Sequence, residues 1–289
     1  MLLRRFRFKS VAIFLSIFVL LLSTVLYQAF PVSGQDKIPR DIIADDFLKN
    51  RANAKSRKPP KKSSYEPVTK LSQPLDPSRL HVGLTIWKLE SVNAGHPGLQ
   101  GDRFKWVPRR VESGAQFREG DSIRLSIESP RAGYLYVVNR DWFVDGTYGE
   151  TNLIFPTKDE NNRLEVAKLI DVPRLDQDPF TASPKPNQSG ELLTFIVTSS
   201  PLPLTLSSKP LPISKTQLAE WERKWGGEAL RFEMKGGAGQ ARTMEEDLAA
   251  SPTGSRQLTR EDPLPQTVYS LIPKNTDGLL FNLVLSYVR

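Results

Sequence analysis

Apolar and polar residues alternate with a period of two along much of the chain after residue 81. The clearest case is Ser122–Glu128, in which isoleucine and leucine alternate with four polar residues. The C-terminal run 279–288 is similar, because every second residue from Leu279 to Tyr287 is large and apolar. Alternation of this kind predicts strands with one face buried in a core and the other face exposed to water.

Turn-forming residues divide these runs into strands. The runs 122–128, 134–138 and 152–155 are separated by a Ser-Pro-Arg-Ala-Gly turn and by a loop containing Asp145 and Gly146, which predicts an antiparallel meander. We expect Asp145-Gly146 to form a structural turn, because glycine adopts the positive φ that such a reversal needs. Further strands are expected at residues 82–89, 104–111, 163–170, 192–198, 229–235, 267–272 and 279–288.

Helix signals are concentrated in the C-terminal third. Ser214 and Thr243 each precede a Gln or Glu by three residues, as in a capping box, and Gly226 is a natural end for the first helix. The second helix is expected to end near Ala250. The predicted fold is therefore mainly β, an antiparallel β-sandwich with Ig-like layers and two short helices inserted in the C-terminal third.

Residues 1–34 have the pattern of a signal peptide or signal anchor. Four basic residues between positions 4 and 9 precede the apolar stretch 11–30, and small residues at 32–34 offer a cleavage point. The alternative is an uncleaved anchor, since about 20 apolar residues span a bilayer as a helix. In both cases we expect the protein to be exported, periplasmic or extracellular, with residues 11–30 tethering it to the inner membrane if they are retained.

Residues 35–80 are rich in basic residues and proline and have no sustained apolar period, which predicts a disordered linker before a single β-rich domain at 81–289. Within this stretch, only DIIADDF at 41–47 has the composition for one or two helical turns. The run Lys49–Lys62 contains seven basic residues and no acidic one. It would act as a spacer or, alternatively, make a weak contact with an anionic membrane surface.

Composition removes several function classes. The 289 residues include no cysteine, which excludes disulfides, thiol catalysis and thiolate zinc sites. The formal net charge is +8, but residues 81–289 hold 25 basic and 26 acidic residues, so the excess lies in the N-terminal segments. A nucleic-acid partner is not expected, because it needs clustered basic residues on the folded surface.

Catalytic patterns are also missing. His81 and His96 are the only histidines, and the sequence has no G-x-S-x-G elbow and no H-E-x-x-H motif, so we expect no catalytic residues, no metal and no cofactor. The 26 acidic residues show no preferred pair. A carboxylate-based hydrolase acting on glycans therefore stays open as an alternative.

A glycine-rich stretch and a tryptophan pair form the candidate surface for a ligand or partner. Its members are Trp221, Trp225, Gly236, Gly237, Gly239 and Arg242. A glycine-rich backbone before a helix favours anions, but no lysine follows the glycines as a P-loop requires, so a strand-to-helix connection is the favoured interpretation. The two tryptophans lie at i, i+4 with Leu218 on the same stripe. Packing on a sheet is favoured for them, and a sugar- or peptide-stacking platform is the alternative.

Several short motifs resemble the bacterial family known as domain of unknown function 4384. The core of the resemblance covers residues 113–205, and the extension 206–289 resembles longer exported members. The matching pieces are residues 117–121 (FREGD), 124–126, 133–137 (GYLYV), 153–156 (LIFP), 191–193, 196–197, 221–226, 236–240 and 262–269. The resemblance implies a β-rich extracytoplasmic module with an accessory or sensory role, because similar domains are appended to kinases, caspase-like peptidases and repeat arrays. It carries over no catalytic residue.

These observations favour a non-enzymatic, exported accessory or binding module of the bacterial cell envelope. Its expected partner is an envelope protein or a glycan. The alternatives are the glycan-active hydrolase and a purely structural spacer between envelope components.

Overall fold

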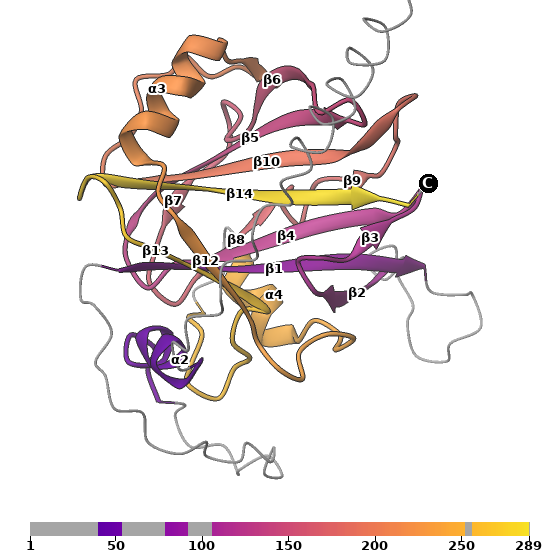
Figure 1. Cartoon of the computed structure of the whole chain (residues 1–289). Helices are drawn as coiled ribbons and strands as arrows, with labels where there is room; N and C mark the ends of the chain where they lie inside the picture. The colour runs from indigo at the N-terminus through magenta and orange to yellow at the C-terminus, as the bar shows by residue number, and fades with distance from the viewer. Residues whose placement is uncertain (1–39, 54–78, 92–105, 252–255, 289) are drawn as a thin grey trace, which may run out of the picture. The chain divides into compact units, whose positions relative to one another are not determined.

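A computed structural model of the chain describes residues 40–53, 79–91, 106–251 and 256–288. These residues form two facing β-sheets with helices on the outside (Figure 1). The export signal expected at residues 1–34 lies outside the described residues, and so does most of the expected linker. Within the described ranges, no helix is both long and apolar enough to cross a membrane.

The first sheet has the strand order β12-β13-β1-β4-β8, with β2 paired to β1 and β9 paired to β4. All of these pairs are antiparallel. The strands are β1 (Leu80–Ser91), β2 (Trp106–Val111), β4 (Ser122–Glu128), β8 (Leu169–Val172), β9 (Phe180–Thr181), β12 (Ala229–Glu233) and β13 (Thr267–Leu271).

The second sheet has the order β11-β6-β5-β10-β14-β3, with β7 paired to β5. Its pairs are antiparallel except β14 with β3, which are parallel. The strands are β3 (Gln116–Phe117), β5 (Gly133–Phe143), β6 (Tyr148–Phe155), β7 (Arg163–Leu164), β10 (Gln188–Thr198), β11 (Leu211–Pro212) and β14 (Gly278–Tyr287). The mainly β sandwich expected from the sequence is thus confirmed.

The core lies between the two sheets, where the apolar faces predicted by the alternation meet. Leu125 of β4 is fully buried, as are Phe195 and most of its apolar neighbours on the second sheet. Phe281 of β14 stacks on Phe195, with ring centroids 5.0 Å apart, and on Tyr269 of β13 at 4.3 Å. Aromatic contacts therefore join the two layers at the centre of the core.

The predicted meander is correct for its second and third strands and wrong for its first strand, β4. β5 and β6 pair in the second sheet, whereas β4 lies in the first. The Ser-Pro-Arg-Ala turn after β4 carries the chain across the sandwich instead of back along the same sheet. The strand expected at 163–170 is likewise divided into β7 and β8, with a turn at Ala167, whose φ is +59°.

The exposed face expected for β4 is also wrong. All seven residues of this strand are buried, including the polar Ser122, Arg124, Ser126 and Glu128. Alternation identifies the face that enters the apolar core, but it says nothing about whether other segments cover the opposite face. Here the outer face of β4 is covered by residues from the segment 40–53 and from the C-terminal third, such as Arg51 and Arg242.

Helices α3 (Lys215–Trp225) and α4 (Met244–Ala250) are the two helices predicted from the capping signals. The Ser214 side chain accepts a hydrogen bond from the Gln217 backbone, and Thr243 forms a full capping box with Glu246. A further helix, α2 (Arg40–Leu48), lies in the range expected to be a linker and includes residues 41–47, for which one or two helical turns were expected. Its Ile43 and Phe47 are buried in the domain, so the linker prediction is wrong for residues 40–53.

Candidate functional site

Helix α3 covers the outer face of the second sheet with the stripe predicted from its sequence. Leu218, Trp221 and Trp225 are buried there. They pack in one apolar cluster with residues of the sheet, namely Tyr136, Val138, Leu153, Ile196 and Leu280. Only 5% of Trp221 and 4% of Trp225 is exposed, so neither ring offers a free face on which a sugar could stack.

The end of α3 is fixed by a polar contact with the loop before β14. The Trp225 indole Nε1 donates to Asp277 Oδ1 at 3.1 Å, and the Lys224 ammonium lies 2.7 Å from the other oxygen of this carboxylate. The hydrogen bond from Lys224 lowers the pKa of Asp277. The same ammonium stands 4.6 Å from the Trp225 ring centroid, in cation–π geometry.

A surface groove of about 600 Å³ lies beside α3. It is lined by residues 198–203, by residues of α3 and by Asp277. The wall residues from α3 are Gln217, Glu220, Trp221, Arg223, Lys224 and Trp225. The lining therefore combines charges of both signs with two largely buried tryptophans, and it contains two of the six residues of the predicted surface.

The glycines of the predicted surface lie elsewhere, at the edge of the first sheet. Gly236 and Gly239 have φ angles of +76° and +82°, which glycine adopts without strain. Gly239 N–H donates to the Arg110 carbonyl at 2.8 Å, and Arg110 N–H donates to the Gln240 carbonyl at 2.9 Å. A Cβ added to Gly237 would lie 2.1 Å from Gln266 Oε1. The loop 236–240 thus pairs with the edge of β2 through its backbone. This arrangement fits the favoured interpretation, a strand-to-helix connection, better than an anion-binding loop.

Arg242 is not available to a ligand. Its side chain is 1% exposed and lies 2.9 Å from the buried carboxylate of Asp171 and 2.7 Å from the exposed carboxylate of Asp247. Its guanidinium also stands 5.3 Å from the ring centroid of Trp87. The six predicted residues therefore divide into two groups, and only the tryptophans lie at an opening.

Arg242 belongs to a buried charged layer that sequence reasoning missed. The layer covers the outer face of the first sheet and contains, among the described residues, the buried pairs Arg51–Glu128, Arg110–Glu246 and Arg242–Asp171. Two of these arginines lie over the Trp87 ring, with the Arg110 guanidinium 5.1 Å from its ring centroid. The partners are far apart in the sequence, and each charge alone is typical of a solvated surface, so no local signal identified them.

A hydrogen-bonded chain connects the layer to the sheet. The Trp87 indole N–H donates to Ser126 Oγ at 2.7 Å, and this hydroxyl donates to Asp171 Oδ1 at 2.6 Å. Arg242 also donates to Ser126 Oγ, at 3.2 Å. Polar residues on β4 that were expected to face water therefore bond within the protein.

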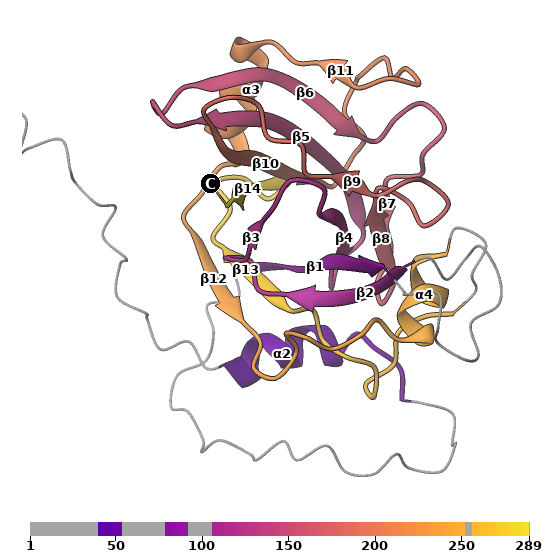
Figure 2. The same ribbon diagram turned by 90° about the vertical axis from the view of Figure 1, so that its right-hand side faces the viewer.

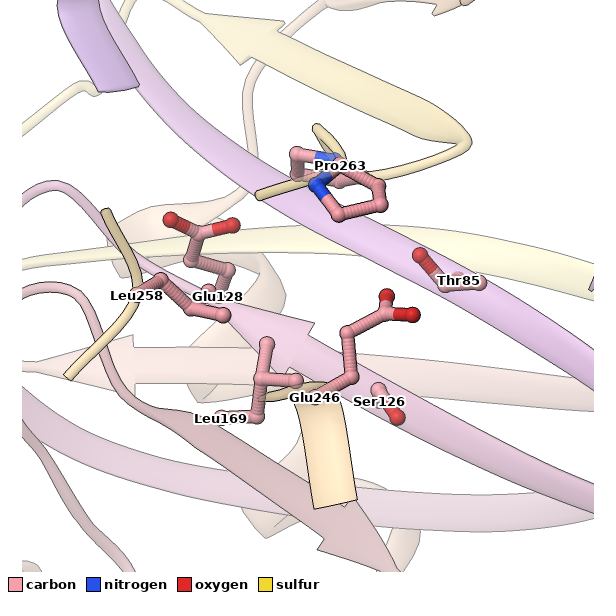
Figure 3. A pocket seen from close by; sticks show the side chains of 8 residues that line it. Thr85, Ser126, Glu128, Leu169, Glu246, Leu258 and Pro263 are labelled. Carbon is pink, nitrogen blue, oxygen red and sulfur yellow. The ribbon is translucent and has the colours of Figure 1, made fainter. Parts of the chain in front are cut away.

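Two carboxylates of the layer approach a cavity of about 10 Å³, which has room for one water molecule (Figure 3). Glu128 comes from β4 and Glu246 from α4, and Thr85 and Ser126 complete the polar lining. Burial raises the pKa of Glu128, and the adjacent Arg51 opposes that rise. Because each carboxylate already bonds an arginine and the space is so small, this arrangement can hold a water molecule but not a sugar.

The remaining predicted residues have structural surroundings. Gly146, with a φ of +81°, lies in the turn between β5 and β6, where Asp145 Oδ1 accepts bonds from the backbone and hydroxyl of Thr147. His81 is buried, and burial lowers its pKa. His96 lies outside the described residues. In the described part of the chain, no three Asp, Glu or His side chains are grouped so that they could hold a metal ion.

Comparison with known proteins adds no relative to this picture. No family model matches the chain, and neither a curated protein nor a solved structure matches it. The resemblance to domain of unknown function 4384 therefore stays a prediction based on short motifs.

Proposed function

We propose that the chain is an exported, non-enzymatic binding module of the bacterial cell envelope, and that it holds a segment of a partner protein in the groove beside α3. The observation that carries this proposal is the groove itself. Its volume of about 600 Å³ is in the range of ligand sites, and its lining contains charged groups of both signs together with apolar residues such as Leu202. Such a lining suits a peptide, which carries both polar backbone and apolar side chains.

Export is supported by the N-terminal sequence. A basic start, an apolar stretch without charge and small residues before position 35 are the three parts of a secretory signal. The motifs resembling domain of unknown function 4384 are consistent with an accessory role.

The alternatives have less support. A glycan platform needs exposed aromatic faces, and both groove tryptophans are almost fully buried. A glycan hydrolase needs two carboxylates with room for a sugar between them, whereas Glu128 and Glu246 adjoin a space for a single water molecule. A spacer on a long flexible tether fits poorly with residues 40–53, which pack into the domain.

A capture experiment with matched variants tests the groove. The full-length chain is used to capture proteins from an envelope extract, beside the double variant Glu220→Lys/Arg223→Glu, which reverses two groove charges without changing the net charge. The control is Lys215→Glu/Glu228→Lys, two exposed residues that do not line the groove. We expect the wild type and the control to capture the same protein in similar amounts. The groove variant should capture at least about tenfold less of it.

Two results would contradict the proposal. Equal capture by all three chains would show that binding takes place away from the groove. Capture that survives protease treatment of the extract would point to a glycan instead.

A further inference from the structure

Helix α3 covers only one half of the outer face of the second sheet. Val138 of β5 belongs to the cluster beneath the helix, and the next outward residues of this strand, Arg140 and Trp142, lie beyond it. In Figure 1, α3 lies toward one end of β5 and β10. The other half of the face is exposed at both of its sides, because Val284 of β14 is 38% exposed and Tyr148 of β6 is 50% exposed.

Two aromatic side chains are neighbours on this open half. Trp142 and Tyr148 lie directly opposite each other in the pairing of β5 with β6, and both are at least partly exposed. The Arg140 guanidinium stands 5.1 Å from the centroid of the Tyr148 ring and so restricts its orientation. Because aromatic residues in opposite positions of two strands interact, the two rings form one continuous aromatic surface.

The row that begins with these rings continues across two more strands. Gly190 of β10 pairs with Trp142, and Ser286 of β14 pairs with Gly190. We call these four positions, Tyr148, Trp142, Gly190 and Ser286, the aromatic row. The glycine adds no side chain beside the indole, and the sheet requires it, since an added Cβ would lie 2.2 Å from the Leu285 carbonyl oxygen. Neighbouring strands are about 4.8 Å apart, so the row repeats at about the length of one pyranose unit in an extended β-1,4-linked glycan.

The polar side chains beside the aromatic row are paired or uncharged. Arg140 lies 3.2 Å from Glu222 of α3, which balances its charge, and it donates to Thr194 Oγ1 at 3.5 Å. Thr194 Oγ1 in turn donates to Asn282 Oδ1 at 2.7 Å. This bond leaves the amide nitrogen of the exposed Asn282 to donate to a ligand. Aromatic faces beside neutral donors match a sugar, which has C–H groups on its ring faces and hydroxyls at its edges, whereas an anionic ligand would need an unpaired cation.

We propose that the aromatic row is a binding site for a neutral, extended glycan of β-1,4-linked pyranose units that lies across β6, β5, β10 and β14. Two successive sugar rings stack on Tyr148 and Trp142. The chain then passes over Gly190, where the lack of a side chain lets it approach the sheet. The site is separate from the groove beside α3 and requires no peptide in that groove.

Titration calorimetry of the full-length chain tests this site. The probes are cellohexaose and chitohexaose, two neutral β-1,4-linked hexasaccharides, and the control sugar is maltohexaose, whose α-1,4 linkage curves the chain. We expect at least one of the two probes to bind. Maltohexaose should bind at least about tenfold more weakly, because a curved chain cannot follow a straight row across the sheet.

Variants of one exposed residue separate stacking from general apolar contact. Tyr148→Leu keeps an apolar side chain but removes the aromatic face, and it should weaken binding of the hexasaccharide about tenfold. Tyr148→Phe keeps the ring and should bind like the wild type. The matched control is Trp106→Ala, which removes an aromatic residue that is 40% exposed on β2 of the first sheet and should leave binding unchanged.

The proposal fails if neither probe binds, or if the Tyr148→Leu chain binds the probe as tightly as the Tyr148→Phe chain. Loss of binding in the groove variant Glu220→Lys/Arg223→Glu would place the glycan beside α3 instead. A dimer of the wild type that Tyr148→Leu disrupts would assign the aromatic row to contact between two copies of the chain.

Discussion

The two outer faces of the sandwich are covered in opposite ways. On the first sheet the cover is charged, and three buried arginine–carboxylate pairs lie over Trp87 and the polar side of β4. On the second sheet the cover is apolar, and α3 presses Leu218 and two tryptophans onto β5, β10 and β14. Figure 2 shows α3 and β11 on one side of the sandwich and α2 and α4 on the other.

The two covers differ in the kind of interaction that holds them on the sheet. An apolar cover needs volume and shape, and it tolerates many substitutions of similar size. A buried charge needs its specific partner, because losing one member of a pair leaves the other without compensation. The charged cover therefore fixes the position of several distant segments at once, whereas the apolar cover leaves the solvent side of α3 free to form a groove.

The largest effect is expected when a central charge of the first cover is removed. Arg242→Met should lower the free energy of unfolding by about 3–5 kcal/mol, because Asp171 would stay buried without its ion-pair partner. The control is Arg109→Met, which breaks the exposed pair with Glu90 and should cost less than about 1 kcal/mol. Urea denaturation measures both, and similar losses would show that the buried layer is not distinct from the surface.

A slightly smaller effect is expected in the apolar cover. Leu218→Ala removes a buried side chain between α3 and the second sheet and should cost about 3 kcal/mol. Because no charge is involved, this loss should be the same in low salt and in 0.5 M salt. A loss that changes strongly with salt would mean that the contacts of α3 are mainly electrostatic.

The next prediction concerns pH. Arg51→Met removes the group that opposes the rise in the Glu128 pKa, so this pKa should rise further. An acid whose pKa is higher in the folded state loses stability as pH rises above its unfolded pKa of about 4.3. We expect a loss of about 2 kcal/mol at pH 7 that becomes smaller at pH 5. The double variant Arg51→Met/Glu128→Leu should not show this dependence, and an unchanged loss at pH 5 would mean that Glu128 is solvated.

The sequence predicted the strands because each carries its own alternation, and it predicted α3 and α4 because caps are local. It did not predict which sheet each strand joins. The turn after β4 has the composition of a hairpin turn, yet it crosses between layers, since the apolar faces of β4 and β5 are buried from opposite sides. Pairing of this kind depends on contacts between distant residues.

The candidate site residues could likewise be predicted only where the pattern that marks them is local in the sequence. The tryptophan stripe was predicted from its own spacing, but the charged layer joins residues from positions 51 to 246, and no local pattern distinguishes them from exposed charges. One signal was present for the N-terminal segment. Ile43 and Phe47 lie four residues apart in the stretch 41–47, for which helical turns were expected, whereas Arg51 lies beyond the end of α2 and has no such signal.

The smallest effects are expected at the N-caps of α3 and α4. One of these helices belongs to the apolar cover and the other to the charged cover, so the two caps can be compared directly. Thr243→Ala should cost about 1 kcal/mol, because Thr243 also holds Glu246, the partner of Arg110, through its hydroxyl and backbone N–H. Ser214→Ala should cost about 0.5 kcal/mol, because its hydroxyl only caps α3. Thr243→Ser keeps the hydroxyl and should preserve most of the stability. Equal losses for the two alanine variants would mean that the cap of α4 does not position the carboxylate of the charged layer.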